Sequence, residues 1–218
     1  MKAGLYAIVD VDACEARRLS PMAVAEGALE GGAAVVQLRA KALGTRPFLA
    51  LALEMSALSR GYGTPFFVND RLDLALAAGA GLHVGQDDLP VATVRALAPS
   101  IPLGLSTHTR DQLTAAPTSQ LTYVAFGPVF PTASKERPSP VVGLERLAEL
   151  ATLTRGIPLV AIGGISLVRV PEAMAAGATL VAAIAGLLPS AGEAFGLGET
   201  ISAVADRARA YDRAARTS

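Results

Sequence analysis

Residues 65–90 read PFFVNDRLDLALAAGAGLHVGQDDLP and contain one pattern twice, a short apolar run that leads into polar and acidic residues. The two apolar runs are Pro65–Val68 and Leu82–Val84, and a helical pattern over Leu72–Ala78 separates them. A run, a helix and a second run predict two parallel strands joined by a helical crossover. The carboxyl ends of the two strands are then neighbours at one edge of a sheet.

Asp70 and Asp88 follow these two runs and are open to two interpretations. Carboxylates at adjacent strand ends could hold one hard cation between them. Both aspartates are also suited to be helix N-caps, because Asp70 precedes the predicted helix and Asp88 precedes Leu89-Pro90. Caps far outnumber metal sites, so these two residues alone favour capping, and the choice depends on the rest of the chain.

The same pattern continues along the chain, which contains eight short apolar runs. They are Leu5–Val9, Val35–Leu38, Pro65–Val68, Leu82–Val84, Pro102–Leu105, Tyr123–Phe126, Pro158–Ile162 and Leu180–Ile184. Helices are predicted between and after them at Pro21–Glu30, Pro47–Ser59, Leu72–Ala78, Val91–Ala98, Leu144–Leu153, Val170–Ala176 and Glu193–Ala215. The runs are continuously hydrophobic, as in strands that are buried on both faces. We therefore predict an α/β fold, a (β/α)8 TIM barrel formed by residues 1–218 as a single domain.

An open doubly wound sheet is the competing fold, but Gly-x-Gly-x-x-Gly does not follow the first run. Composition supports one core, since 51% of the residues are hydrophobic and no Ser/Gly linker divides the chain. A formal net charge of zero argues against nucleic acid as a partner. The uncharged residues 173–192 are better explained by a helix end, a buried strand and a turn than by a membrane span. The single cysteine, Cys14, fits a cytoplasmic location.

The turns after the predicted strands carry a chemically consistent set of side chains. In a TIM barrel the active site lies at this end. The polar and charged residues there include Gln37, Arg39, Lys41, Asn69, Asp70, Gln86, Asp87, Asp88, Ser106, Thr107, His108, Thr132, Ser134 and Lys135. The chain has only three lysines, and two of them, Lys41 and Lys135, belong to this set. Cations that face a pair of carboxylates would suit a polyphosphate bound with Mg²⁺.

Two further turns are candidates for binding a phosphate. Gly163-Gly164 follows the seventh run and Ala185-Gly186 follows the eighth, where barrels often hold a phosphate on backbone N–H groups. A tight turn that needs glycine for backbone reasons is an equally common explanation of a Gly-Gly pair.

Several of these segments together resemble the thiamine-phosphate synthase family, also called thiamine-phosphate pyrophosphorylase. The matching segments are QLRAK (37–41), VNDR (68–71), HVGQDD (83–88), GLS (104–106), GPVFPTASK (127–135) and AIGGI (161–165). The resemblance implies a barrel enzyme that joins hydroxymethylpyrimidine diphosphate to thiazole phosphate and releases pyrophosphate, with Mg²⁺ as cofactor. It implies small-molecule partners, no membrane and a cytoplasmic enzyme, and it leaves open whether the enzyme is a homodimer.

The resemblance also implies roles for individual residues. Asp70 and Asp88 would be the metal ligands, and Lys135, Ser106, Arg39 and Lys41 would be catalytic. The substrates would be bound by Gln37, Arg39, Lys41, Asn69, Ser106, Thr132, Ser134 and Lys135, with backbone at Gly164, Ile184 and Ala185. The implied mechanism is dissociative: diphosphate leaves, a pyrimidinyl-methyl cation forms, and the thiazole nitrogen attacks it. His83 is then interpreted as a hydrogen-bonded strand residue, and His108 as a loop residue without a role.

Two alternatives follow from departures or branches of the family. A thiazole tautomerase-like isomerase of the same fold would carry a histidine at the position of Pro128 and would usually lack the acidic turn. A catalytically degenerate regulator that binds thiazole phosphate or thiamine phosphate is motivated by Ala185, where the family commonly has serine, and by a segment before Gly85 that is one residue short. We also predict that the loop from Pro131 to Val142 is a mobile lid.

Overall fold

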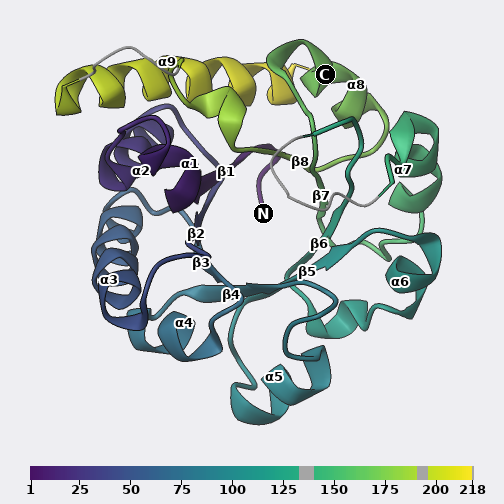
Figure 1. Cartoon of the computed structure of the whole chain (residues 1–218). Helices are drawn as coiled ribbons and strands as arrows, with labels where there is room; N and C mark the ends of the chain where they lie inside the picture. The colour runs from purple at the N-terminus through teal and green to yellow at the C-terminus, as the bar shows by residue number, and fades with distance from the viewer. Residues whose placement is uncertain (133–139, 191–195, 218) are drawn as a thin grey trace.

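Eight parallel strands close into a barrel in the computed structural model, which describes residues 1–132, 140–190 and 196–217 (Figure 1). The strands are β1 (Gly4–Asp10), β2 (Val35–Arg39), β3 (Phe66–Asn69), β4 (Gly81–Val84), β5 (Leu103–Thr107), β6 (Tyr123–Phe126), β7 (Leu159–Ala161) and β8 (Leu180–Ala183). Each strand pairs with the next in sequence, and β8 pairs with β1 through Leu5 and Val181 among others. The predicted TIM barrel is therefore confirmed.

Helices surround the barrel on its outside (Figure 1). They are α1 (Val11–Glu15), α2 (Pro21–Glu30), α3 (Thr45–Gly61), α4 (Leu72–Ala78), α5 (Val91–Leu97), α6 (Arg110–Ala115), α7 (Gly143–Ala151), α8 (Val170–Ala175) and α9 (Leu197–Arg216). Short 3-10 turns complete the described segments at η1 (Thr118–Gln120), η2 (Leu167–Arg169) and η3 (Ala185–Leu187). The helices α2 and α4 have the predicted bounds, whereas α1 and α6 were not predicted.

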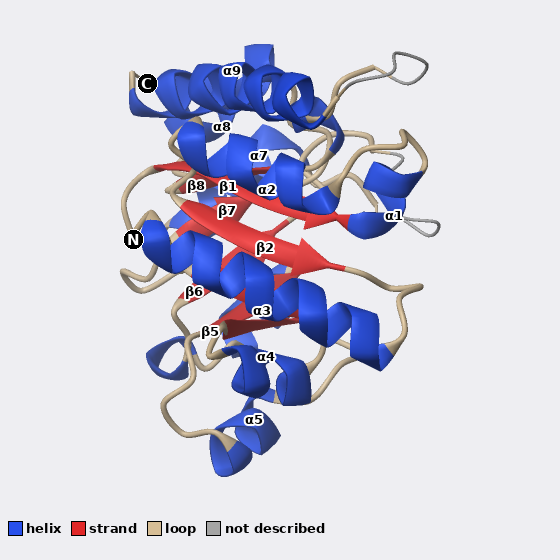
Figure 2. Cartoon of the chain, turned by 90° about the vertical axis from the view of Figure 1, so that its left-hand side faces the viewer, coloured by secondary structure: helices blue, strands red, loops and turns tan. Residues whose placement is uncertain are grey.

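The side chains of each strand alternate between two cores. On β1, Leu5, Ala7 and Val9 belong to the core between the strands and the helices, whereas Tyr6 and Ile8 belong to the core inside the barrel. The inner core is small and contains aromatic residues, which fill the space that eight strands enclose. All eight strands are parallel, and Figure 2 shows the arrows of β1 and β2 pointing to one side of the molecule. Residues that follow the strands are thereby gathered on one rim.

The first and last parts of the chain meet where α2 packs against α9. Gly27, in the middle of α2, allows this close approach, because a methyl carbon on it would lie 2.5 Å from the carbonyl oxygen of Ile201 and 2.8 Å from Cβ of Val204. Real carbon atoms do not approach so closely, so the two helices touch along their backbones at this point.

We expect Gly27→Ala to destabilise the protein, although alanine is the better helix former by about 1 kcal/mol. The new methyl group would force α2 and α9 apart, and overpacking of this kind costs roughly 1–3 kcal/mol. Urea unfolding would measure the change. Gly61→Ala, at the end of α3, is the matched control, since nothing lies within 4 Å of its added carbon. Equal effects of the two substitutions would contradict the close packing.

Candidate active site

Asp70 and Asp88 follow β3 and β4 on the rim, and their carboxyl groups interact with each other. Burial of Asp70, the hydrogen bond to Asp88 and the charge of Asp88 raise the pKa of Asp70 from 3.8 to about 6, while Lys41 and Arg39 oppose the shift. Two carboxyl groups so close repel each other when both are ionised. A bound cation would relieve this repulsion.

Neither aspartate caps a helix through its side chain. The N-cap residue of α4 is Arg71 and that of α5 is Pro90, and neither position has a side-chain cap. One oxygen of Asp88 accepts a hydrogen bond from the backbone N–H of Gly85 at 2.7 Å, which fixes the turn after β4. The capping interpretation is therefore wrong.

The backbone of Asp70 has a left-handed conformation, with φ of 64°. Its N–H donates to the carbonyl oxygen of His83 at 2.8 Å, so β3 remains tied to β4 just where it ends. Aspartate and asparagine tolerate this conformation better than most residues. The turn thus directs the Asp70 carboxyl group toward Asp88 at the cost of some backbone strain.

Arg39 and Lys41 supply positive charge on the same rim, since both favour the ionised form of Asp70. Arg39 forms an ion pair with Asp10, at the end of β1, and both side chains are largely buried. The other oxygen of Asp10 accepts a hydrogen bond from the N–H of Ala13 at 2.9 Å, so this carboxylate also caps α1. We did not predict Asp10 from the sequence, although an acidic residue directly after the first run was a usable signal.

Gln37 lies within β2, Asn69 ends β3, and Ser106 is the second-last residue of β5. The Gln37 amide nitrogen donates to Oδ1 of Asn69 at 2.9 Å. Ser106 is hydrogen bonded to Nε2 of His83 at 2.8 Å, and its carbonyl oxygen accepts from the Gln86 side chain at 2.6 Å. The structure thus brings these three predicted residues to the same rim as the aspartates, and His83 is the hydrogen-bonded strand residue that we expected.

The turns after β7 and β8 form the opposite part of the rim. Gly164 has φ of 63°, and a carbon added to it would overlap the carbonyl oxygen of Pro131 and approach Cβ of Phe130 at 2.9 Å. The guanidinium group of Arg169 lies 4.3 Å from the centre of the Phe130 ring and donates to the Gly164 carbonyl at 3.3 Å. Glycine is thus required at position 164 by the turn itself. Ala185, which begins η3 directly after Ile184, is exposed.

Three of the predictions concern the long loop after β6. Ser134, Lys135 and most of the predicted lid lie outside the residues that the structure describes. Thr132, at the edge of that segment, is half-buried.

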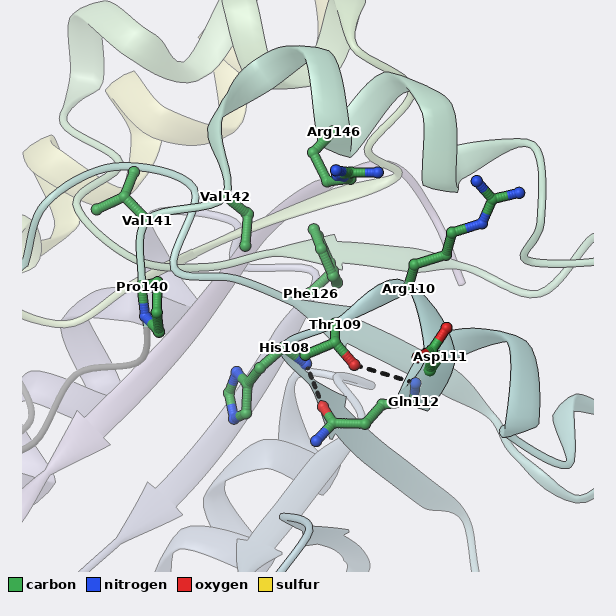
Figure 3. Close-up of a pocket in the computed structure, with 10 residues that line it drawn as sticks. All are labelled: His108, Thr109, Arg110, Asp111, Gln112, Phe126, Pro140, Val141, Val142 and Arg146. Carbon is green, nitrogen blue, oxygen red and sulfur yellow. Dashed lines mark hydrogen bonds between the residues drawn. The ribbon is translucent and has the colours of Figure 1, made fainter.

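A pocket of about 580 Å³ lies beside the rim, between α6, the end of β6 and the start of α7 (Figure 3). It is lined by His108, Thr109, Arg110, Asp111, Gln112, Phe126, Pro140, Val141, Val142 and Arg146. None of the predicted site residues that the structure describes lines it. The ring of His108 donates from Nδ1 to the Gly127 carbonyl at 2.6 Å, which joins the turns after β5 and β6.

Within the described part of the chain, His, Cys, Asp and Glu side chains do not gather in threes at any place suited to a metal ion. The rim therefore offers a cation two carboxylates, Asp70 and Asp88, and leaves other ligands to come from elsewhere. Of the helices in residues 1–132, 140–190 and 196–217, none combines the length and apolar character needed to cross a membrane.

The chain is similar in sequence and in structure to known proteins of one family. Residues 5–187 match the family model described as thiamine monophosphate synthase. The thiamine-phosphate synthase of Laribacter hongkongensis is 43% identical over 189 residues, which cover 86% of this chain and 88% of that protein. The thiamine-phosphate synthase of Chlorobium phaeovibrioides is 44% identical over 168 residues, covering 76% and 80%. A solved thiamine phosphate pyrophosphorylase from Pyrococcus furiosus superposes with a TM-score of 0.81 at 29% identity, covering 99% of this chain and 96% of that one.

Proposed function

The chain belongs to the thiamine monophosphate synthase family, and from this premise we propose that it condenses 4-amino-2-methyl-5-hydroxymethylpyrimidine diphosphate with 4-methyl-5-(2-hydroxyethyl)thiazole phosphate. It is a transferase that forms thiamine phosphate and releases pyrophosphate. The observation that best supports this assignment is the pairing of Asp70 with Asp88 on a rim that also carries Arg39 and Lys41. Such a site suits a diphosphate that is bound with a divalent cation.

Asp70 and Asp88 are the residues that would hold Mg²⁺. Burial of Asp70 and its interaction with Asp88 raise the pKa of Asp70, although the positive charges of Lys41 and Arg39 oppose the shift. Mg²⁺ commonly binds one or two protein carboxylates and takes its remaining ligands from water and substrate phosphates. Bound there, the ion would neutralise part of the diphosphate charge.

The side chains of the rim account for the reaction by charge stabilisation and positioning. The bond between the pyrimidine methylene carbon and the diphosphate oxygen breaks, and a bond from that carbon to the thiazole nitrogen forms. Negative charge grows on the departing diphosphate, where Arg39, Lys41 and Lys135 stabilise it. Gln37, Asn69 and Ser106 hold the pyrimidine ring, so the carbon that reacts is kept facing the thiazole.

The thiazole phosphate binds across the rim from the aspartates, at the Gly164 turn and at the backbone of Ile184 and Ala185, with Thr132 and Ser134 completing its site. The exposed position of Ala185 leaves room for the phosphate. Alanine provides no hydroxyl group there, so the backbone N–H groups at the start of η3 donate the hydrogen bonds to the phosphate. The loss corresponds to about one hydrogen bond, roughly 1 kcal/mol of binding.

The isomerase alternative is not favoured. The chain keeps Pro128 and the acidic turn at 86–88. The relatives that it matches over most of its length are named as synthases. A cytoplasmic location and a homodimeric state remain predictions made from the sequence.

We expect the purified protein to form thiamine phosphate and pyrophosphate from the two substrates when Mg²⁺ is supplied. Turnover should fall to background when a chelator removes the metal, and it should return when Mg²⁺ is added in excess. A coupled pyrophosphate assay measures both changes. If a well-folded protein binds thiamine phosphate tightly by calorimetry but releases no pyrophosphate with Mg²⁺ present, it is the degenerate regulator and the proposed reaction is wrong.

A further inference from the structure

A chain of hydrogen bonds crosses the interior of the barrel and connects three residues of the proposed pyrimidine site. It runs from Asn69 to Gln37 at 2.9 Å, to the hydroxyl of Tyr6 at 2.8 Å, to that of Tyr123 at 2.6 Å, to Nδ1 of His83 at 2.7 Å, and from Nε2 of His83 to Ser106 at 2.8 Å. The six side chains come from six different strands. Asn69 and Ser106, the two ends of this hydrogen-bond network, are thus joined through the core.

The middle of this chain is deeply buried. Tyr6 is 1% exposed and Tyr123 is fully buried, and burial raises the pKa of both phenols. Polar groups placed there cost free energy unless they are hydrogen bonded, and an apolar layer would fill the same space. Gly104 on β5 makes room for Tyr123, since a side-chain carbon on it would overlap the tyrosine ring. The absence of a side chain at Gly104 therefore leaves the space that the Tyr123 ring occupies in this network.

The donor and acceptor of each hydrogen bond in this network follow from the bond between Gln37 and Asn69. The Gln37 side chain gives its N–H to Asn69, so its carbonyl oxygen accepts from the single hydroxyl hydrogen of Tyr6. The Tyr6 oxygen must then accept from Tyr123, whose own oxygen accepts from His83. His83 is thereby the Nδ1–H tautomer when neutral, and its Nε2 lone pair accepts the hydroxyl hydrogen of Ser106.

We infer that His83, with Tyr123 and Tyr6, is a positioning residue that fixes the hydroxyl of Ser106 as a hydrogen-bond acceptor toward the substrate. The inference rests on the proposed function. The hydrogen of Ser106 points inward to His83, so only its lone pairs face the site. At the other end Asn69 uses its oxygen for Gln37 and can present only its N–H donors. The site is then complementary to a ring with an N–H donor toward β5 and an acceptor toward β3, as an aminopyrimidine has.

An acceptor at Ser106 would also assist the reaction. A hydrogen bond from the exocyclic amino group of the pyrimidine to Ser106 draws the N–H hydrogen toward the oxygen and increases electron release into the ring. Electron release stabilises the positive charge that develops on the methylene carbon as diphosphate departs. The effect is greatest in the transition state, so it belongs to kcat more than to KM.

Measuring the tautomer of His83 by NMR tests the inference without an activity assay. The protein has two histidines, His83 and His108, so ¹⁵N-histidine labelling gives few signals, and His108→Gln assigns them. We expect neutral His83 with hydrogen on Nδ1 in the wild type. In Tyr123→Phe the acceptor for that hydrogen is gone, and the Nε2–H tautomer, which donates to Ser106, should become the main form. A wild-type ring that is charged or carries its hydrogen on Nε2 overturns the inference.

The kinetic consequence is measured in the same variant. We expect kcat of Tyr123→Phe to fall about tenfold, the loss of one oriented hydrogen bond, while KM for the pyrimidine diphosphate changes less than about threefold. Thr107→Val is the matched control. Thr107 is the buried neighbour of Ser106, and its hydroxyl group donates to the Ala125 carbonyl at 3.0 Å. The substitution therefore removes one buried hydrogen bond that is not part of the network from Asn69 to Ser106.

The control should lose a similar amount of thermal stability and keep the wild-type kcat. If Tyr123→Phe does not fold, Tyr6→Phe serves instead, because it frees the Tyr123 hydrogen to turn toward His83 and reverses the same tautomer. A wild-type kcat in a variant whose tautomer has changed contradicts the inference. An inactive wild-type protein contradicts the proposed function alone, since the tautomer measurement still stands.

Discussion

Asp70→Asn is expected to lower turnover by about 100- to 1000-fold and, in the same molecule, to make the metal-free protein more stable. The carboxylate is one of two candidate ligands for Mg²⁺, and removing an electrostatic group that acts on transition-state charge costs roughly 100- to 1000-fold. Asparagine keeps the size of the side chain and tolerates the left-handed backbone at this position. Alanine would add strain and confuse the comparison.

The stability effect depends on pH in a direction that follows from the raised pKa. In the folded metal-free protein the pKa of Asp70 is about 6, above its unfolded value of 3.8. The protonated carboxyl group therefore favours the folded state below about pH 4, and this contribution is lost as the pH rises through 6. Because the side chain is partly solvated, we expect the variant to gain about 1 kcal/mol over the wild type above pH 7 and almost nothing at pH 4.

Urea unfolding at the two pH values, with a chelator present, measures this difference. Asp87→Asn is the matched control, because Asp87 is exposed in the same acidic turn. It should keep both turnover and stability near those of the wild type. If Asp70→Asn unfolds at the same urea concentration as the wild type at high pH, neither the burial of Asp70 nor its repulsion by Asp88 is significant in solution.

Arg39→Gln should lower the stability by about 3 kcal/mol and turnover by about 100-fold, for two separate reasons. The substitution removes a cation from the diphosphate site. It also leaves the carboxylate of Asp10 buried without its ion-pair partner, and breaking one side of a buried pair is strongly destabilising.

The double variant Asp10→Asn/Arg39→Gln separates the two reasons. Asparagine can still accept the hydrogen bond from Ala13 at the start of α1, and it carries no charge to be left unpaired. We expect the stability of the double variant to return to within about 1 kcal/mol of the wild type, while turnover stays low. Recovery of turnover together with stability would mean that Arg39 acts only as a structural partner of Asp10.

The sequence was sufficient for the fold because each strand and most helices show their pattern locally. The helix Leu72–Ala78 could be bounded to the residue, since an acidic turn precedes it and Gly79, with φ of 62°, ends it. The position of the described rim residues followed from the order of strands, because every parallel strand places its next residues at the same end, whereas Ser134 and Lys135 stay predictions.

The contacts within the site could not be predicted in the same way. Tyr6 and Tyr123 lie in apolar runs and read as ordinary core residues, yet their hydroxyl groups meet across 117 positions of sequence. Whether Asp88 caps a helix or faces Asp70 depends on the direction of one side chain in a turn, which no pattern of residue types specifies. Asp10 was missed for the related reason that its partner, Arg39, lies on the neighbouring strand.

The pairing of β8 with β1, and of α9 with α2, also has a consequence for how the protein is made. The first strand has one of its two neighbours missing until residues 180–183 have left the ribosome. During synthesis its free edge is a template for pairing with another chain. The ribosome thus holds an open, incomplete sheet for most of translation, and we expect a nascent chain that ends before α9 to depend on chaperones far more than the released protein does.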